Sequence, residues 1–190
     1  MMGQGREAVD VLLAESFKEL ARKQPIEKIT IKEITDKAGL IRPTFYNHFQ
    51  DKYELVEWII TAQLLKPLEP LLQNGMVNEA LLLLFTSIER EQEFYARACR
   101  MEGQNSFESI AKECVKRVLL RILTENSAEK AVEHIWLTPE LIAEYYAQSM
   151  CYMLIRWVES GMTISAKDLL CAYNYMMKHS MDEVFKEFCK

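Results

Sequence analysis

The sequence predicts an all-α protein with two helical domains, and three observations support this. Apolar residues recur at helical spacing along most of the 190 residues, glycines and prolines are few, and helix-start signals precede several apolar stretches. A chain of this length can bury a sizeable core. We therefore expect an N-terminal domain with a connector helix over residues 1–66 and a C-terminal helical domain over residues 67–190.

The first helix is expected over residues 6–23. Val9, Leu13, Phe17 and Leu20 lie on one stripe of such a helix. An apolar stripe of this kind has to be covered by another element. We expect it to pack on the two short helices that follow and to complete a three-helix domain.

Residues 30–52 predict two short helices joined by a tight turn at Gly39. Thr30, with Glu33 three residues later, forms a capping box that starts the first helix. Gly39 is free to take a left-handed conformation and ends it. The second helix is expected over residues 42–49. A helix-turn-helix of this geometry lets a protein lay one short helix in the major groove of DNA.

The second helix has two different faces. The face expected to point inward is apolar and aromatic: Ile41, Phe45 and Phe49. The outward face consists of Arg42, Pro43, Tyr46 and Asn47. It offers the guanidinium of Arg42, the phenol of Tyr46 and the amide of Asn47. Such groups bond base edges and phosphates, so the outward face is the predicted reading surface. His48, near the inward edge, is either a phosphate ligand or a packing histidine with a satisfied hydrogen bond.

A connector helix is expected over residues 52–65. Asp51 caps its start and places Lys52 in the first turn, where a lysine can meet a phosphate beside the helix's own amide donors. The helix is apolar over so much of its surface that we expect it to be buried between two layers. Pro67 and Pro70 are expected to end it, which places the domain boundary there.

The rest of the chain predicts long helices with brief interruptions. They are expected over residues 77–101 with a break near Glu91, over 106–123, over 138–160 and from 165 to the chain end. The polar residues 125–134 predict a loop or a short helix. The helix over 138–160 has apolar residues on more than one face, which favours a homodimer through the last two long helices. The alternative is a helix buried inside its own domain.

The charges are unevenly distributed. Residues 1–66 carry ten basic and ten acidic side chains, whereas residues 67–190 carry thirteen basic and eighteen acidic ones. The overall net charge of -5 therefore arises from the second domain. The first domain remains free to approach phosphates, with an affinity that falls as salt rises.

The segment over residues 30–55 resembles the DNA-binding unit of the TetR-type transcriptional regulators. The residues that carry the resemblance are Ile31, Ile34, Ala38, Gly39, Pro43, Thr44, Phe45, Tyr46, His48, Phe49, Asp51, Lys52 and Leu55. One position departs from the pattern. Such regulators often have a serine or threonine where this chain has Ile41, so a capping bond worth about 1 kcal/mol is in doubt.

The resemblance implies a set of DNA contacts. In such regulators the position of Tyr46 lies against the DNA, and other positions hold the backbone or face the bases. The expected DNA-binding residues are Thr30, Lys32, Arg42, Pro43, Thr44, Tyr46, Asn47, His48 and Lys52. Two copies, spaced by one helical turn of roughly 34–36 Å, would read a palindromic operator in double-stranded DNA.

The resemblance also implies control by an effector in the second domain. We expect a repressor that a small molecule releases from DNA, with the connector helix as transmitter. The alternative is an activator, or a regulator controlled by a protein partner, because the second domain also resembles regulators of dihydroxyacetone kinase operons, where a protein coactivator can replace the small effector. Aromatic and methionine residues could line a pocket or form core: Phe94, Tyr95, Met101, Phe107, Trp136, Tyr145 and Tyr146. Effector-binding residues stay unassigned.

Other classes of protein find no support in the sequence. His48, His134 and His179 are far apart and no HExxH or GxSxG pattern occurs, so no enzyme, metal site or cofactor is expected. No apolar run approaches the roughly 18 residues of a membrane span. Five cysteines without a CxxC pair predict reduced thiols, and no signal peptide is evident. We therefore expect a cytoplasmic protein without a membrane partner.

Overall fold

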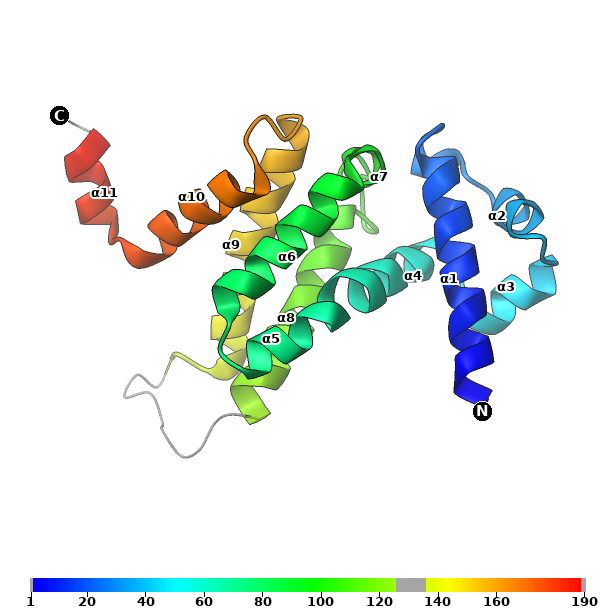
Figure 1. Ribbon diagram of the computed structural model, residues 1–190, viewed down its shortest axis with the longest axis horizontal. Helices are drawn as coiled ribbons and strands as arrows, with labels where there is room; N and C mark the ends of the chain where they lie inside the picture. Colours follow the sequence, from blue (N-terminus) through cyan, green and yellow to red (C-terminus); the bar gives the residue numbers. More distant parts are fainter. Residues whose placement is uncertain (1, 126–135, 189–190) are drawn as a thin grey trace.

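The computed structural model describes residues 2–125 and 136–188, and within these ranges it is helical without β-strands (Figure 1). In chain order the elements are α1 (Met2–Ala21), η1 (Ile26–Lys28), α2 (Ile31–Ala38), α3 (Arg42–His48), α4 (Lys52–Trp58), η2 (Ile59–Leu65), η3 (Lys66–Leu68), α5 (Glu69–Gln73), α6 (Val77–Arg90), α7 (Gln92–Ala98), α8 (Phe107–Glu125), α9 (Pro139–Glu159), α10 (Ala166–Lys178) and α11 (Met181–Phe188). The predicted all-α class is confirmed. The expectation for residues 125–134 lies almost wholly outside the described residues.

The helices form two groups along the longest axis of the molecule. Figure 1 shows α1, α2 and α3 together at one end and α10 and α11 at the other. Between them, α8 and α9 pack against each other, and α6 packs on α10. The chain from α4 to α5 runs from the first group into the second. The predicted three-helix unit and helical second part are therefore both present.

The first group has a small apolar core. Leu13 and Phe17 of α1 meet Ile34 of α2, Phe45 of α3 and Leu55 of α4, and all five side chains are fully buried. Burial of each such side chain stabilises the fold by about 1.5–3 kcal/mol. This core fixes the position of α3, whose other face remains at the surface.

Helix caps lie where the sequence predicts them. The Thr30 hydroxyl accepts from Glu33 N, and the Glu33 carboxylate accepts from Thr30 N at 2.8 Å, which completes the capping box. Gly39 has a φ of 68° and ends α2 in the left-handed conformation. Side-chain oxygens of Asp51 and Thr138 cap α4 and α9. These local signals therefore set the helix boundaries.

The connector is longer than expected. Pro67 and Pro70 do not end the helical path, because each lies in the first turn of a new helix, where a missing N–H costs nothing. The connector begins as α4 and continues as the π-helix η2, in which the Lys66 N–H donates to the Thr61 carbonyl. A 3₁₀ turn and α5 extend it to Gln73. Most of its apolar residues are buried as far as Leu68, as predicted, whereas Leu71 and Leu72 of α5 are only half-buried.

The last helix is not continuous. It begins at the predicted Ser165 cap but ends at Lys178, and α11 begins after Ser180. Ser180 and Glu183 form a second capping box, with Ser180 N donating to Glu183 Oε2 at 2.7 Å and Glu183 N donating to Ser180 Oγ at 3.3 Å. His179 adopts an extended backbone before it. This new helix start at Ser180 splits the predicted helix in two.

A buried lysine joins the two groups. Lys18 of α1 is only 3% exposed, and its ammonium lies 2.7 Å from Glu15 Oε1, 2.9 Å from Gln63 Oε1 in η2 and 2.8 Å from Glu91 Oε2 between α6 and α7. A buried charge requires such partners, and removing one of them is costly. This network links the first group to the connector and to the second group at one point.

Candidate nucleic-acid interface

The recognition helix α3 is anchored by its inner face. Phe45 is fully buried and Phe49 nearly so, as predicted. Ile41 is different, because 67% of it is exposed. It has an extended backbone as the N-cap of α3, so the helical period that predicted an inward direction does not apply to it. No side chain caps α3, which confirms the doubt about this cap.

The outward face of α3 carries polar groups that lie together. An Arg42 guanidinium nitrogen lies 3.3 Å from the Tyr46 hydroxyl and the guanidinium carbon 5.9 Å from the ring centre. Arg42, Pro43, Tyr46 and Asn47 are all exposed. This face therefore presents the predicted guanidinium, phenol and amide on one short, well-anchored helix.

The threonines and Lys32 flank this face in different ways. The Thr30 hydroxyl is engaged in the capping box of α2, where it also donates to Glu33 Oε2 at 2.7 Å. Thr44 is half-buried, and its backbone N–H donates to the Ile41 carbonyl at 2.9 Å. Lys32 is exposed on α2. The Lys32 ammonium is thus accessible to a phosphate, whereas the Thr30 hydroxyl already has partners.

The end of α3 is tied to α1. His48 Nδ1 lies 2.6 Å from Asp10 Oδ1, and an Arg6 guanidinium nitrogen donates to the Asn47 carbonyl at 3.4 Å. His48 and Asp10 are 12% and 13% exposed. Asp10 and Arg6 do not stand out in the sequence, because both lie on the polar side of α1 and only the packing of α1 on α3 brings them to α3.

Lys52 departs from its expected role. Its ammonium donates to the carbonyls of Ile26, Glu27 and Ile29 at 2.9, 2.6 and 3.0 Å. Lysine has three donors, so all are taken. Burial lowers the pKa of Lys52. In this structure the Lys52 ammonium is engaged by the end of η1 ahead of α2, and its contact with a phosphate stays a prediction.

Family models match both parts of the chain. One described as "Bacterial regulatory proteins, tetR family" matches residues 16–59, and one described as "Transcriptional regulator C-terminal region" matches residues 77–186, more than half of the chain. The chain belongs to the TetR family of transcriptional regulators. Both models describe regulators and not enzymes, which agrees with the sequence-based prediction.

Similar proteins give the same family. The "HTH-type dhaKLM operon transcriptional activator DhaS" of Lactococcus lactis subsp. lactis (strain IL1403) is 28% identical over 145 residues, 74% of each chain. A solved structure of "Dihydroxyacetone kinase operon activator DhaS" superposes with a TM-score of 0.64 at 21% identity, covering 88% of this chain and 93% of that chain. A solved structure of Thermus thermophilus FadR in complex with lauroyl-CoA superposes with a TM-score of 0.63 at 15% identity, covering 90% of this chain and 94% of that chain. The expected likeness to dihydroxyacetone kinase operon regulators is confirmed.

The described residues of this TetR-family chain contain neither a membrane-spanning helix nor a metal-binding cluster. None of the helices within residues 2–125 and 136–188 has the length and apolarity that crossing a membrane requires. In the same ranges, no three His, Cys, Asp or Glu side chains are placed to hold a metal ion together.

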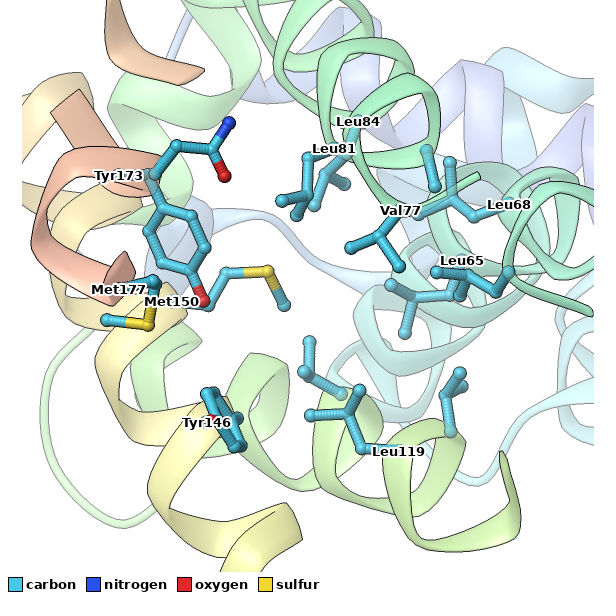
Figure 2. A pocket seen from close by; sticks show the side chains of 15 residues that line it. Leu65, Leu68, Val77, Leu81, Leu84, Leu119, Tyr146, Met150, Tyr173 and Met177 are labelled. Carbon is cyan, nitrogen blue, oxygen red and sulfur yellow. The ribbon is translucent and has the colours of Figure 1, made fainter. Parts of the chain in front are cut away.

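The second part of this TetR-family chain contains an apolar cavity of about 250 Å³. Figure 2 shows Tyr173, Met150 and Met177 across from Leu65, Leu68 and Val77. The cavity is lined by Leu65, Leu68, Leu72, Val77, Ala80, Leu81, Leu84, Val115, Val118, Leu119, Tyr146, Met150, Tyr173, Asn174 and Met177. No charged side chain is among them. The cavity thus joins the connector to α9 and α10.

The aromatic residues that the sequence singled out are divided among three places. Tyr146 lines the cavity. Phe94, Tyr95, Met101 and Phe107 belong to the buried core, which is the alternative the sequence left open. Trp136 and Tyr145 are exposed. The aliphatic residues that form most of the cavity wall gave no distinct signal, because their spacing is the same as that of core residues.

α9 and α10 each expose several apolar side chains. Tyr145 and Tyr152, seven residues apart on α9, are 62% and 58% exposed. Met176 and Cys171 of α10 are exposed too. By contrast, Cys151 is buried, and burial raises its thiol pKa to about 12. Tyr145 and Tyr152 thus lie on the same side of α9 and are both open to solvent.

Proposed function

We propose that this TetR-family regulator binds a palindromic operator in double-stranded DNA as a homodimer, with α3 in the major groove. The observation that carries the proposal is the exposed polar face of α3 on a fully buried framework. Arg42, Pro43 and Asn47 would face the bases, and Tyr46 would lie against the DNA. A guanidinium and an amide are suited to bidentate contacts with guanine and adenine.

The backbone contacts would come from the residues around that face. We assign Thr44, His48 and Lys32 to phosphates, with Thr30 at the start of α2. Lys52 would support these contacts indirectly, since its ammonium holds the carbonyls of η1. Phosphate contacts fix the register of a protein on the duplex and make its affinity depend on salt.

The homodimer would form through α9 and α10. The exposed tyrosines of α9 and the exposed Met176 of α10 supply an apolar surface that a second copy would cover. A two-fold pair of this kind presents two copies of α3 to successive major grooves. Analytical ultracentrifugation of Tyr152→Glu, a change on α9, against the wild type tests this interface. Lys167→Ala, at an exposed site on α10, serves as the control. An unchanged dimer in Tyr152→Glu contradicts this interface.

Control by a small molecule is supported by the cavity. A ligand there would contact Leu65 and Leu68 of the connector on one side and Tyr173 of α10 on the other. Filling it would shift the connector against the proposed dimer helices and change the spacing of the two α3 helices. We therefore propose a repressor that an uncharged, apolar effector releases from DNA. The boundary between its two domains would lie near residue 66. The protein would act in the cytoplasm, where operators lie.

A second candidate is an activator. It is favoured by the relative of Lactococcus lactis, whose name describes a transcriptional activator. A regulator of this kind could answer to a protein partner instead of a small molecule. Transcription in vitro from the promoter beside this chain's own gene, with and without the purified protein, shows whether the protein represses or activates transcription.

The DNA-binding proposal is tested by gel shift on the DNA upstream of the chain's own gene. Arg42→Ala is expected to weaken specific binding by about 1–3 kcal/mol per protomer and to relax specificity at one base pair. Lys167→Ala, far along the chain on α10, should bind like the wild type. Specific binding that survives Arg42→Ala and Tyr46→Ala unchanged contradicts the proposal.

A further inference from the structure

The contact between α1 and the end of α3 has a chemical consequence. A carboxylate only accepts hydrogen bonds, so the Asp10 Oδ1 at 2.6 Å fixes the proton on His48 Nδ1. In a neutral imidazole, Nε2 is then an acceptor. A phosphate oxygen is also an acceptor, and the two cannot form a hydrogen bond. Only the imidazolium form can donate from Nε2.

Several charged side chains surround His48, but only one acidic side chain contacts it directly. Arg6 and Asp10 of α1, Glu54 and Glu57 of the connector and Arg117 of α8 line the same depression as His48. Glu57 is paired with Arg117 at 2.5 Å. The Glu54 carboxylate accepts the Gln50 N–H at 2.5 Å. Arg6 donates to the Asn47 carbonyl. Asp10 is therefore the acid in direct contact with His48.

The position of His48 in its helix acts in the same direction. It is the last residue of α3, where the partial negative charge of a helix C-terminus favours a cation. Both His48 and Asp10 are largely buried, so water screens their interaction less than it would at an open surface. The pair is thus built to hold an imidazolium of fixed orientation next to the predicted reading surface.

We infer that Asp10 is a positioning residue for DNA binding, which fixes the proton on His48 Nδ1 so that the imidazolium form donates from Nε2 to a DNA phosphate. The inference rests on the proposed placement of α3 on DNA. Where the imidazole is neutral in the free protein, binding to DNA is coupled to the uptake of a proton from solvent. Because DNA binding favours the protonated form, affinity is expected to be greatest at low pH and to fall as the pH rises.

The test measures the dissociation constant of a fluorescent duplex, selected from a random pool by the wild-type protein, between about pH 5.5 and 8.5 at constant ionic strength. The wild-type affinity is expected to fall roughly tenfold per protomer across this range. His48→Gln should bind more weakly at low pH and show a flat profile. His179→Gln is the matched control, because that exposed histidine lies on the far part of the chain, and its profile should equal the wild type's.

Asp10→Asn separates positioning from mere structure. Its amide oxygen can still accept from Nδ1, but the charge is lost, so binding should weaken more at neutral pH than at low pH. Asp10→Glu should restore the wild-type pH profile. Calorimetry in buffers of different ionisation enthalpy should show proton uptake on binding for the wild type that is absent in His48→Gln. Thermal unfolding checks that each variant is folded.

The outcomes distinguish the inference from the proposed function. If His48→Gln binds the duplex with the same pH profile as the wild type, the inference fails while DNA binding stands. An Asp10→Asn variant that weakens binding equally at every pH also overturns it, since that would be a structural effect. If the wild type selects no duplex at all, the proposed function fails, and the inference fails with it.

Discussion

The two helices of the helix-turn-helix begin in opposite ways. α2 begins with reciprocal hydrogen bonds between Thr30 and Glu33 and ends at a left-handed glycine. α3 begins at an exposed isoleucine without a side-chain cap. What holds α3 is tertiary: Phe45 in the core and the contacts of α1 with its last turn. The supporting helix is thus defined by its own sequence, and the recognition helix by its neighbours.

The largest expected effect comes from the tertiary anchor of α3. Phe45→Ala removes a fully buried ring and should lower the free energy of unfolding by about 3–5 kcal/mol. Chemical denaturation followed by circular dichroism measures it. Tyr46→Ala, exposed on the same helix, should change it by less than about 0.5 kcal/mol. Equal losses in the two variants would show that α3 is not anchored as described.

Lys52 gives the next effect, and it separates support from phosphate contact. Lys52→Met leaves the carbonyls of Ile26, Glu27 and Ile29 without their donor and should cost about 1–3 kcal/mol of stability. The dependence of DNA affinity on salt should stay unchanged. In exposed Lys32→Met the reverse is expected: unchanged stability and a salt slope smaller by about one per protomer. A smaller slope in Lys52→Met would assign it to a phosphate after all.

The cap of α2 should contribute a moderate amount. Thr30→Ala removes the acceptor of the Glu33 N–H and is expected to cost about 1 kcal/mol in the free energy of unfolding. Thr163→Ala, at an exposed site outside the helices, serves as the control and should have almost no effect. If the two variants unfold alike, the capping box contributes nothing and the contrast between α2 and α3 is lost.

Adding a cap to α3 should give a smaller gain. Ile41 has the extended backbone of an N-cap, so Ile41→Ser can place a hydroxyl near the free N–H groups of the first turn. We expect the free energy of unfolding to rise by about 0.5–1 kcal/mol. Ile41→Ala shortens the side chain without a hydroxyl and should give no such gain. A Ser variant no more stable than the Ala variant would mean that tertiary contacts already fix this turn.

The smallest expected effect is a pH dependence at the start of α2. Hydrogen bonds from Gln24 and from Thr30 lower the pKa of Glu33 to about 2. Since an unfolded glutamate titrates near about 4.3, the stabilisation is complete above that pH and is lost as the pH falls through about 2. The stability difference between the wild type and Glu33→Gln should therefore shrink on acidification. A difference independent of pH in urea unfolding curves would contradict this.

Local signals made both ends of α2 and the start of α4 predictable from the sequence. A capping box, a glycine at the helix end and the Asp51 cap all act within four residues, so the sequence contains both partners of each bond. The same signal at Ser180 and Glu183 was hidden by an apolar stripe that continues across it. The division of the last helix was thus present in the sequence but masked by the helical period.

Contacts between distant segments were not predictable in this way. The partners of Lys52 lie 23 to 26 residues earlier in the chain, and Asp10 is 38 residues from His48. The burial of Lys18 depends on the meeting of α1 with the connector and the end of α6. Helical spacing places such side chains on a face but does not say what covers that face. The exposed polar face of α3 was predicted, and the contacts that support the helix were not.

The π-helical stretch of the connector sets the orientation of all that follows it. Each of its hydrogen-bonded rings encloses one more residue than an α-helical ring does, as in the bond from Lys66 N–H to the Thr61 carbonyl. The side chains that follow are therefore rotated about the helix axis relative to their positions in a continuous α-helix. Leu65 and Leu68 line the cavity with that altered rotational phase. The hydrogen-bond class of a single segment thus decides which side chains the cavity receives.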